Sequence, residues 1–234
     1  MRGIILLIWF ASTGLAIAAE DFAEAMQAAM ANLRTATSYA RTGNTALAQL
    51  ETNEATANWQ RVQDQSLAAF AAPYPPAALE TFLSTGRQHL DAADRAFKNG
   101  DNSGAGRELL ALRRSFHDLR HASGFYDLGD CIFEIAPAME ALRTAATRFS
   151  EDASPSRIED VISTASVFRD RLQRCNNWAS EDVSRQPEFR RLIDGAIASA
   201  GEIAHAATSR DGPLVHRYLI ELQSYAQLLD FNFG

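Results

Sequence analysis

One helical sequence pattern occurs twice in this chain, and this repetition restricts its fold more than any other feature. The segment MANLRTAT (30–37) matches MEALRTAA (139–146), and RELLALRRSF (107–116) aligns with RYLIELQSYA (217–226). Both matches have an offset of about 110 residues, which is the length of one small domain. The sequence therefore predicts an internal duplication.

The two predicted units, 19–124 and 125–234, each contain four segments whose apolar residues recur with the period of a helix. In the first unit the four apolar stripes are Phe22, Met26, Ala29, Leu33 and Ala36–Ala40; Leu47, Leu50, Trp59 and Val62; Leu79, Phe82, Leu83, Gly86, Leu90, Ala93 and Phe97; and Ala105, Leu109, Leu112, Phe116 and Leu119. In the second unit they are Cys131, Ile135, Met139, Leu142, Ala146 and Phe149; Ile158, Val161, Ala165, Phe168, Leu172 and Cys175; Phe189, Leu192, Ala196 and Ile203; and Leu219, Leu222, Tyr225 and Leu229. Four amphipathic helices with short links pack as an up-down-up-down bundle. We therefore predict an all-α protein of two tandem up-down-up-down four-helix bundles.

The first 18 residues have the composition of a secretory signal peptide. Arg2 gives a short basic segment, Ile4–Phe10 is an uninterrupted apolar run, and AIA (16–18) fits the cleavage rule. We expect cleavage after Ala18, export to the periplasm and no stable membrane insertion afterwards. The alternative is a retained membrane anchor, although the apolar run is short for a span of about 20 residues.

The overall charge excludes one class of partner. The formal net charge is −7, and no basic stripe with interleaved aromatic residues occurs. Because such a surface repels phosphate backbones, we expect no nucleic-acid binding. The sequence also contains no G-x-S-x-G, Walker, HExxH or dinucleotide-binding motif, so we do not expect an enzyme.

The chain has two cysteines, Cys131 and Cys175. They lie near the start of the first predicted helix of the second unit and near the end of its second helix, and these ends are neighbours in an antiparallel pair. In an exported chain we expect a disulfide, which closes a loop of more than forty residues. The alternative is two buried free thiols.

Two pairs of metal-ligating side chains fall at the same end of the first predicted bundle. Met26 and Met30 are one helical turn apart near the start of its first helix, and His117 and His121 are one turn apart near the end of its fourth. Thioether sulfur and imidazole nitrogen are ligands of iron and copper. We therefore predict a candidate metal or haem site at this end.

The same stretches resemble a known family, the four-helix-bundle cytochromes of the bacterial periplasm, which include the soluble b-type cytochrome and the cytochromes c-prime. EDFAEAMQAAMANL (20–33) resembles the helix that carries the methionine ligand of the b-type protein. LRRSFHDLR (112–120) resembles the helix that carries its axial histidine, and RAFKNGDNSGA (95–105) resembles the turn before that helix. The resemblance implies haem iron ligated by Met26 and His117.

The resemblance implies non-covalent haem b. A c-type cytochrome attaches haem through CxxCH, but the two cysteine positions before His117 hold Arg113 and Phe116. Arg113 is then expected to pair with a haem propionate. Phe82 and Leu83 are expected to line the ring.

The second unit departs further from the family. Ile135 and Gln227 occupy the positions that correspond to the two predicted ligands, and Met139 alone makes no haem site. We interpret this unit as a degenerate copy without a cofactor. We expect His205 and His216 to be exposed helix residues.

Three functions remain open from the sequence. The first is electron transfer or haem carriage with a redox partner that the sequence does not identify. The second is copper binding through Met26, Met30, His117 and His121. The third is a cofactor-free interaction module, in which the methionines fill the core and the histidines are ordinary helix-end residues. The many alanines of the first unit fit either room for a cofactor or close helix packing.

Overall fold

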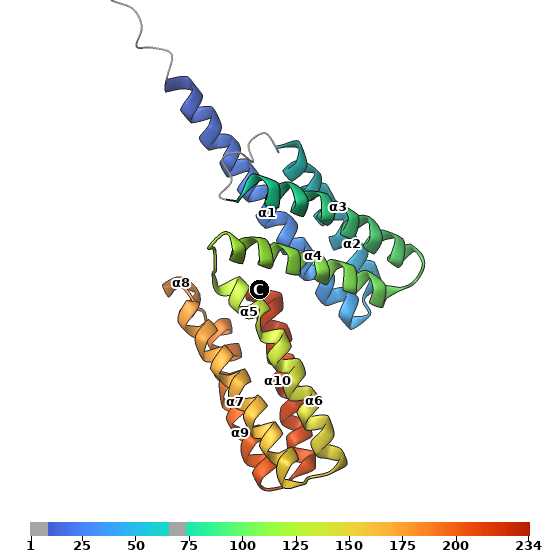
Figure 1. Cartoon of the computed structure of the whole chain (residues 1–234), viewed down its shortest axis with the longest axis vertical. Helices are drawn as coiled ribbons and strands as arrows, with labels where there is room; N and C mark the ends of the chain where they lie inside the picture. Colours follow the sequence, from blue (N-terminus) through green and yellow to red (C-terminus); the bar gives the residue numbers. More distant parts are fainter. Residues whose placement is uncertain (1–8, 66–73) are drawn as a thin grey trace, which may run out of the picture. The chain divides into compact units, whose positions relative to one another are not determined.

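The structure is a computed structural model that describes residues 9–65 and 74–234. Within these ranges every regular element is a helix, which confirms the all-α prediction. The chain divides into two compact units, Met1–Phe125 and Tyr126–Gly234, drawn in Figure 1. The internal duplication stays a prediction.

Unit one contains four long helices within residues 9–65 and 74–125. They are α1 (Trp9–Thr42), α2 (Thr45–Asp64), α3 (Pro76–Lys98) and α4 (Asn102–Ala122). Asn44 caps α2 by accepting a hydrogen bond from the Leu47 backbone N–H at 3.3 Å, and Asp101 caps α4 through Gly104 at 2.7 Å. Neighbours in sequence pack side by side, and α4 packs back on α1, so the four helices form a ring around one core.

Alanine residues let α1 and α2 pack closely. The buried small residues of these two helices are Ala25, Ala29, Ala36 and Ala40 on α1 and Ala48, Thr52 and Ala55 on α2. Their burial fits close helix packing, one of the two alternatives that the sequence left open.

This packing corrects one sequence prediction. Leu47 and Leu50 were expected on the buried face of α2, but they are 37% and 53% exposed. The helix turns its small residues toward α1 because short side chains on both helices allow the backbones to approach. Trp59 and Val62, the other two residues of that stripe, are fully buried as predicted.

Unit two has four long helices and two short ones. They are α5 (Leu128–Phe133), α6 (Ile135–Glu151), α7 (Pro155–Trp178), α8 (Glu181–Ser184), α9 (Pro187–Thr208) and α10 (Gly212–Phe233). The helices α6, α7, α9 and α10 pack as a ring, and α5 covers one end of it against α7 and α10. The break between α5 and α6 falls at Glu134, where Pro137 has no N–H to bond the Phe133 carbonyl.

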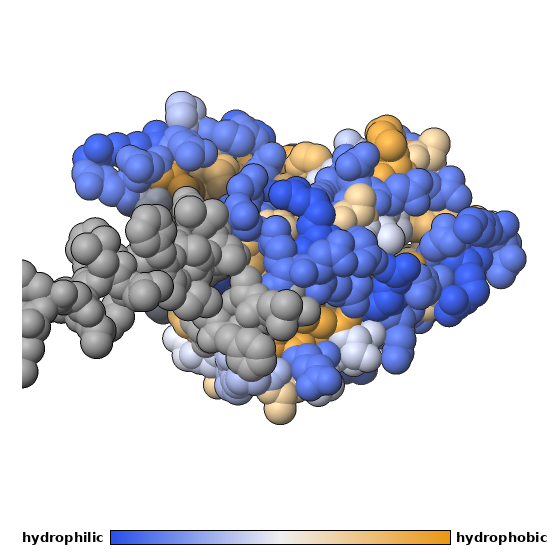
Figure 2. All heavy atoms as spheres, turned by 90° about the horizontal axis from the view of Figure 1, so that it is seen from above, coloured by the Kyte–Doolittle hydropathy of each residue, from blue (hydrophilic) through white to orange (hydrophobic). Residues whose placement is uncertain are grey.

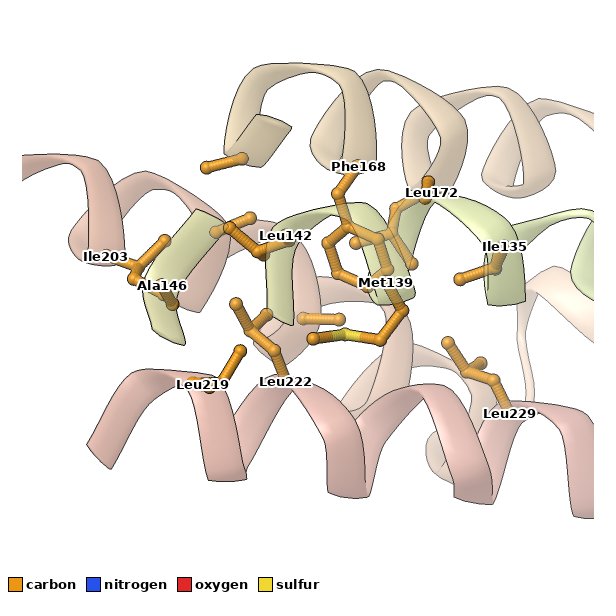
Figure 3. Close-up of a cluster of buried hydrophobic side chains, with 14 of the residues drawn as sticks. Ile135, Met139, Leu142, Ala146, Phe168, Leu172, Ile203, Leu219, Leu222 and Leu229 are labelled. Atoms are coloured by element: carbon orange, nitrogen blue, oxygen red, sulfur yellow. The ribbon is translucent and has the colours of Figure 1, made fainter. Parts of the chain in front are cut away.

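The core of unit two is largely aliphatic. Figure 3 shows side chains of α6, α7, α9 and α10 pointing toward one another, with Met139 among Leu142, Leu222 and Phe168. At the end of α10, the Phe233 ring packs edge-on against Phe189 at 5.2 Å between centroids. The apolar stripes predicted for this unit lie on its buried side.

The two cysteines of unit two are paired. The Sγ atoms of Cys131 and Cys175 lie at bonding distance, 2.12 Å, and their Cα atoms are 5.4 Å apart. Both side chains are buried, as expected for residues on facing apolar stripes. The disulfide connects α5 to the last turns of α7.

The predicted leader is only partly described. Its first eight residues lie outside the described ranges, and α1 begins at Trp9 and continues past Ala18. Cleavage after Ala18 therefore stays a prediction. Among the described residues, no helix is long and apolar enough to cross a membrane.

Candidate functional site

An aromatic cluster marks one end of unit one. The Phe82 ring on α3 lies 5.2 Å from the Trp59 ring on α2 and 5.7 Å from the Phe116 ring on α4. The Trp59 indole N–H donates to the Leu83 carbonyl at 3.3 Å. The end of α2, the start of α3 and the end of α4 therefore meet at one level of the bundle.

Hydrogen bonds between α1 and α2 place Met26 at the same level. Asn32 on α1 donates to Glu51 at 2.8 Å and accepts from Asn58 at 3.0 Å, both on α2. Because the two helices are antiparallel, Met26, six residues before Asn32 in the sequence, lies toward the end of α2, where Trp59 is found. Met26 is only 4% exposed and belongs to the same buried cluster as Trp59.

His117 lies beside this cluster. It follows Phe116, which packs against the buried core, and its own side chain is 15% exposed. Its Nδ1 atom is 3.4 Å from a carboxylate oxygen of Asp118, and its ring is stacked 6.2 Å from the ring of His121. His121 is exposed, as expected. Met26 and His117 thus come from the same end of neighbouring helices, and their joint ligation of iron stays a prediction.

Two further predicted residues flank this region. Arg113, one turn before His117 on α4, is buried, and it is the only basic residue buried among those whose side chains are described. Met30 is half-buried against the core cluster.

The side chains of Met26 and His117 are of the types that ligate haem iron, but the aromatic side chains packed beside them restrict the space for a haem ring. Methionine sulfur with histidine nitrogen is an established axial pair for haem iron. However, Trp59 and Phe82 fill the space between the helices, and a Cβ added at Gly86 would overlap the Trp59 ring. Haem would therefore have to displace some of these aromatic side chains.

No conventional metal cluster is present among the residues that the structure describes. No group of three or more His, Cys, Asp or Glu side chains there is arranged to hold a metal ion. A copper site at this end of unit one would therefore depend on sulfur from Met26 and Met30 in addition to the two histidines.

The matching positions of unit two hold different residues. Ile135 is buried, Gln227 is exposed, and Met139 is part of the aliphatic core in Figure 3. His205 and His216 are exposed, as predicted. Nothing in this unit corresponds to the Met26 and His117 pair.

Sequence reasoning missed the central role of Trp59. The signal was present in Gly86, because a glycine on the apolar stripe of α3 leaves space for a large ring on the facing helix. It also missed the contacts of Tyr126, whose hydroxyl donates to Glu134 at 3.0 Å. Tyr126 lies just before α5, outside any helical period.

Comparison with known proteins gives no match. No family model matches the chain, and no curated protein or solved structure is significantly similar to it. The resemblance to cytochromes therefore depends only on the short motifs of α1 and α4 and on the turn between α3 and α4.

Proposed function

We propose that unit one binds haem b non-covalently, with Met26 and His117 as axial ligands, for electron transfer or haem carriage in the periplasm. The observation that carries this proposal is the position of both residues at one end of neighbouring antiparallel helices, beside a single aromatic cluster. Bound haem would supply one-electron redox chemistry at its iron.

Three side chains of unit one have defined parts in this proposal. Met26 offers a thioether from a water-poor core, and His117 offers an imidazole at the core edge. Arg113 offers a buried positive charge one turn from His117, suited to a propionate. Phe82 would lie against the ring, since it already belongs to the aromatic cluster at this level.

The test is a haemin titration of the purified chain, followed by absorption spectroscopy before and after dithionite. We expect a Soret band and narrow bands in the reduced form, lost in Met26→Ala and in His117→Ala. The matched controls are Met139→Ala, which changes a methionine in the corresponding region of unit two, and His121→Ala. Both variants should retain haem binding. An unchanged spectrum, or binding that survives both ligand variants, contradicts the proposal.

Export is the second part of the proposal. The pairing of Cys131 and Cys175 supports it, because disulfides form and persist in oxidising compartments. Mass spectrometry of the chain from a periplasmic fraction should show a species that begins at Ala19. A chain of full length found only in the cytoplasm or the membrane would contradict export.

Copper binding is a second candidate function, favoured by one observation. The rings of His117 and His121 lie side by side, 6.2 Å apart, one turn from each other on α4. A copper site needs both pairs of ligands, whereas haem needs one residue from each helix. His121→Ala and Met30→Ala should therefore abolish copper binding in a calorimetric titration and leave haem binding largely unchanged.

A further inference from the structure

A tyrosine and a tryptophan are in edge-to-face contact in unit two. The ring centroids of Tyr126 and Trp178 are 4.9 Å apart, with an angle of 60° between the ring planes. Trp178 is the last residue of α7 and is 47% exposed, whereas Trp59 is fully buried. Of the tryptophans whose side chains the structure describes, Trp178 alone is accessible to a dissolved oxidant.

Tyr126 has a carboxylate placed to accept its phenolic proton. Its hydroxyl donates to Glu134 Oε2 at 3.0 Å, and Arg171 donates to the same oxygen at 2.9 Å. Glu134 lies at the break between α5 and α6, so the Pro137 interruption helps to direct this side chain. The arrangement is a phenol, a base and a cation in one hydrogen-bonded chain.

Burial and the charges around Tyr126 keep its hydroxyl protonated. Burial first, then the hydrogen bond to Glu134 and its negative charge, raise the pKa of Tyr126 to about 12, with Asp130 adding to the rise and Arg174 opposing it. The hydroxyl therefore remains a donor to Glu134 throughout the physiological pH range. A phenol gives up an electron far more readily when its proton can leave at the same time.

We propose that Trp178, Tyr126 and Glu134 form a one-electron oxidation relay in unit two, in which the exposed indole reacts with an external high-potential one-electron oxidant. The indole of Trp178 transfers one electron to the oxidant. Tyr126 then returns one electron to the indole, and its phenolic proton passes to Glu134 Oε2. The products are the reduced oxidant, the restored indole, a neutral tyrosyl radical and a protonated Glu134.

The relay is independent of haem and of unit one. All of its residues belong to unit two, from Tyr126 to Trp178. The proton transfer avoids a charged radical in a partly buried site, where an unpaired charge is disfavoured. An exported chain that meets oxidants would thereby move the damage from an exposed indole to a tyrosine that a reductant can restore.

The test is flash photolysis of the full chain with tris(bipyridine)ruthenium(II) and persulfate, which generate a ruthenium(III) oxidant. Transient absorption should show an indole radical that converts to a tyrosyl radical. In Glu134→Gln we expect the rate of this conversion to fall by about tenfold or more, because the proton acceptor is lost. In Tyr126→Phe the indole radical should persist and the tyrosyl signal should disappear.

Two controls separate the relay from general damage to the fold. Arg171→Gln breaks the same ion pair as Glu134→Gln but keeps the carboxylate, so the conversion should remain at least as fast as in the unmodified chain. Tyr218→Phe removes another tyrosine of unit two and should change nothing. The proposal is overturned if Tyr126→Phe keeps the tyrosyl signal, or if Glu134→Gln and Arg171→Gln slow the conversion equally.

Discussion

The two units share an order of long helices but use their cores differently. Unit one contains an aromatic cluster around Trp59, a close alanine interface between α1 and α2, and the predicted haem ligands. Unit two contains a disulfide and a largely aliphatic core in which the buried rings are all phenylalanines, and it has Ile135 and Gln227 where those ligands would be. The comparison shows that the same ring of helices accommodates quite different core side chains.

The surfaces of the two units do not differ in the way that their cores do. Hydrophilic residues cover most of the face in Figure 2, and apolar residues occur between them in small groups. Exposed large apolar side chains occur in both units, for example Leu50 in unit one and Val167 in unit two. The difference between the units therefore lies in the core.

The largest effect is expected from the disulfide. The double change Cys131→Ala and Cys175→Ala frees a loop with a sequence separation of 44 residues. The chain-entropy model gives a loss of about 4 kcal/mol in the free energy of unfolding of unit two. Native-state hydrogen exchange read by mass spectrometry measures each unit separately. Equal losses in both units would show that their stabilities are coupled and would break the comparison.

A smaller effect is expected from adding a methyl group at Gly86, beside Trp59. In Gly86→Ala the new methyl group overlaps the Trp59 ring, which is fully buried and packed against Phe82. We expect unit one to lose about 1–3 kcal/mol through overpacking. Chemical denaturation, monitored through the hydrogen exchange of amides in unit one, measures this loss.

Unit two offers a matched control for this change. A methyl group at Gly195 meets the hydroxyl end of the Tyr225 side chain, which is only half-buried. Gly195→Ala should therefore be close to neutral, because the gain in helix propensity offsets the small displacement. A loss as large as that of Gly86→Ala would contradict the contrast between the two cores.

The smallest effect concerns one ion pair on the surface of unit two. Arg143 donates to Glu140 at 2.8 Å, and this hydrogen bond lowers the pKa of Glu140 below its ordinary value of 4.5. The pair stabilises the folded state above that ordinary value, and the contribution is lost as the pH falls through the lower folded pKa. The effect is small because exposed pairs are screened by water and salt.

The repeat in unit one lacks this pair, since Ala31 stands where unit two has Glu140. Thermal unfolding of the chain and of Glu140→Gln should therefore differ slightly at neutral pH and converge in acid, with the change confined to unit two. If the difference in thermal stability between the chain and Glu140→Gln grew as the pH fell, the sign of the pH dependence would be reversed. That result would contradict the stabilising role of the Glu140–Arg143 pair.

Much of this architecture could be predicted from local signals. Helix periods, the Asn44 cap and the glycine after α3 are properties of short segments, and they indicated the helices of both units. The cysteine pair was predictable because both residues lie on apolar stripes at neighbouring helix ends. The haem ligation by Met26 and His117 was inferred from the sequence and stays a prediction.

The sequence by itself determined the helices, most of their apolar faces and the cysteine pair, because period, capping and turn residues act within a few positions. The tertiary structure alone decided which face of α2 turns inward, since the alanines of α1 favour Ala48 and Ala55 over Leu47 and Leu50. It also decided the fit of Trp59 beside Gly86 and the contact of Tyr126 with Glu134 and Trp178. These contacts join segments with no shared period, and packing forces depend on the shape of the partner surface, which no local pattern encodes.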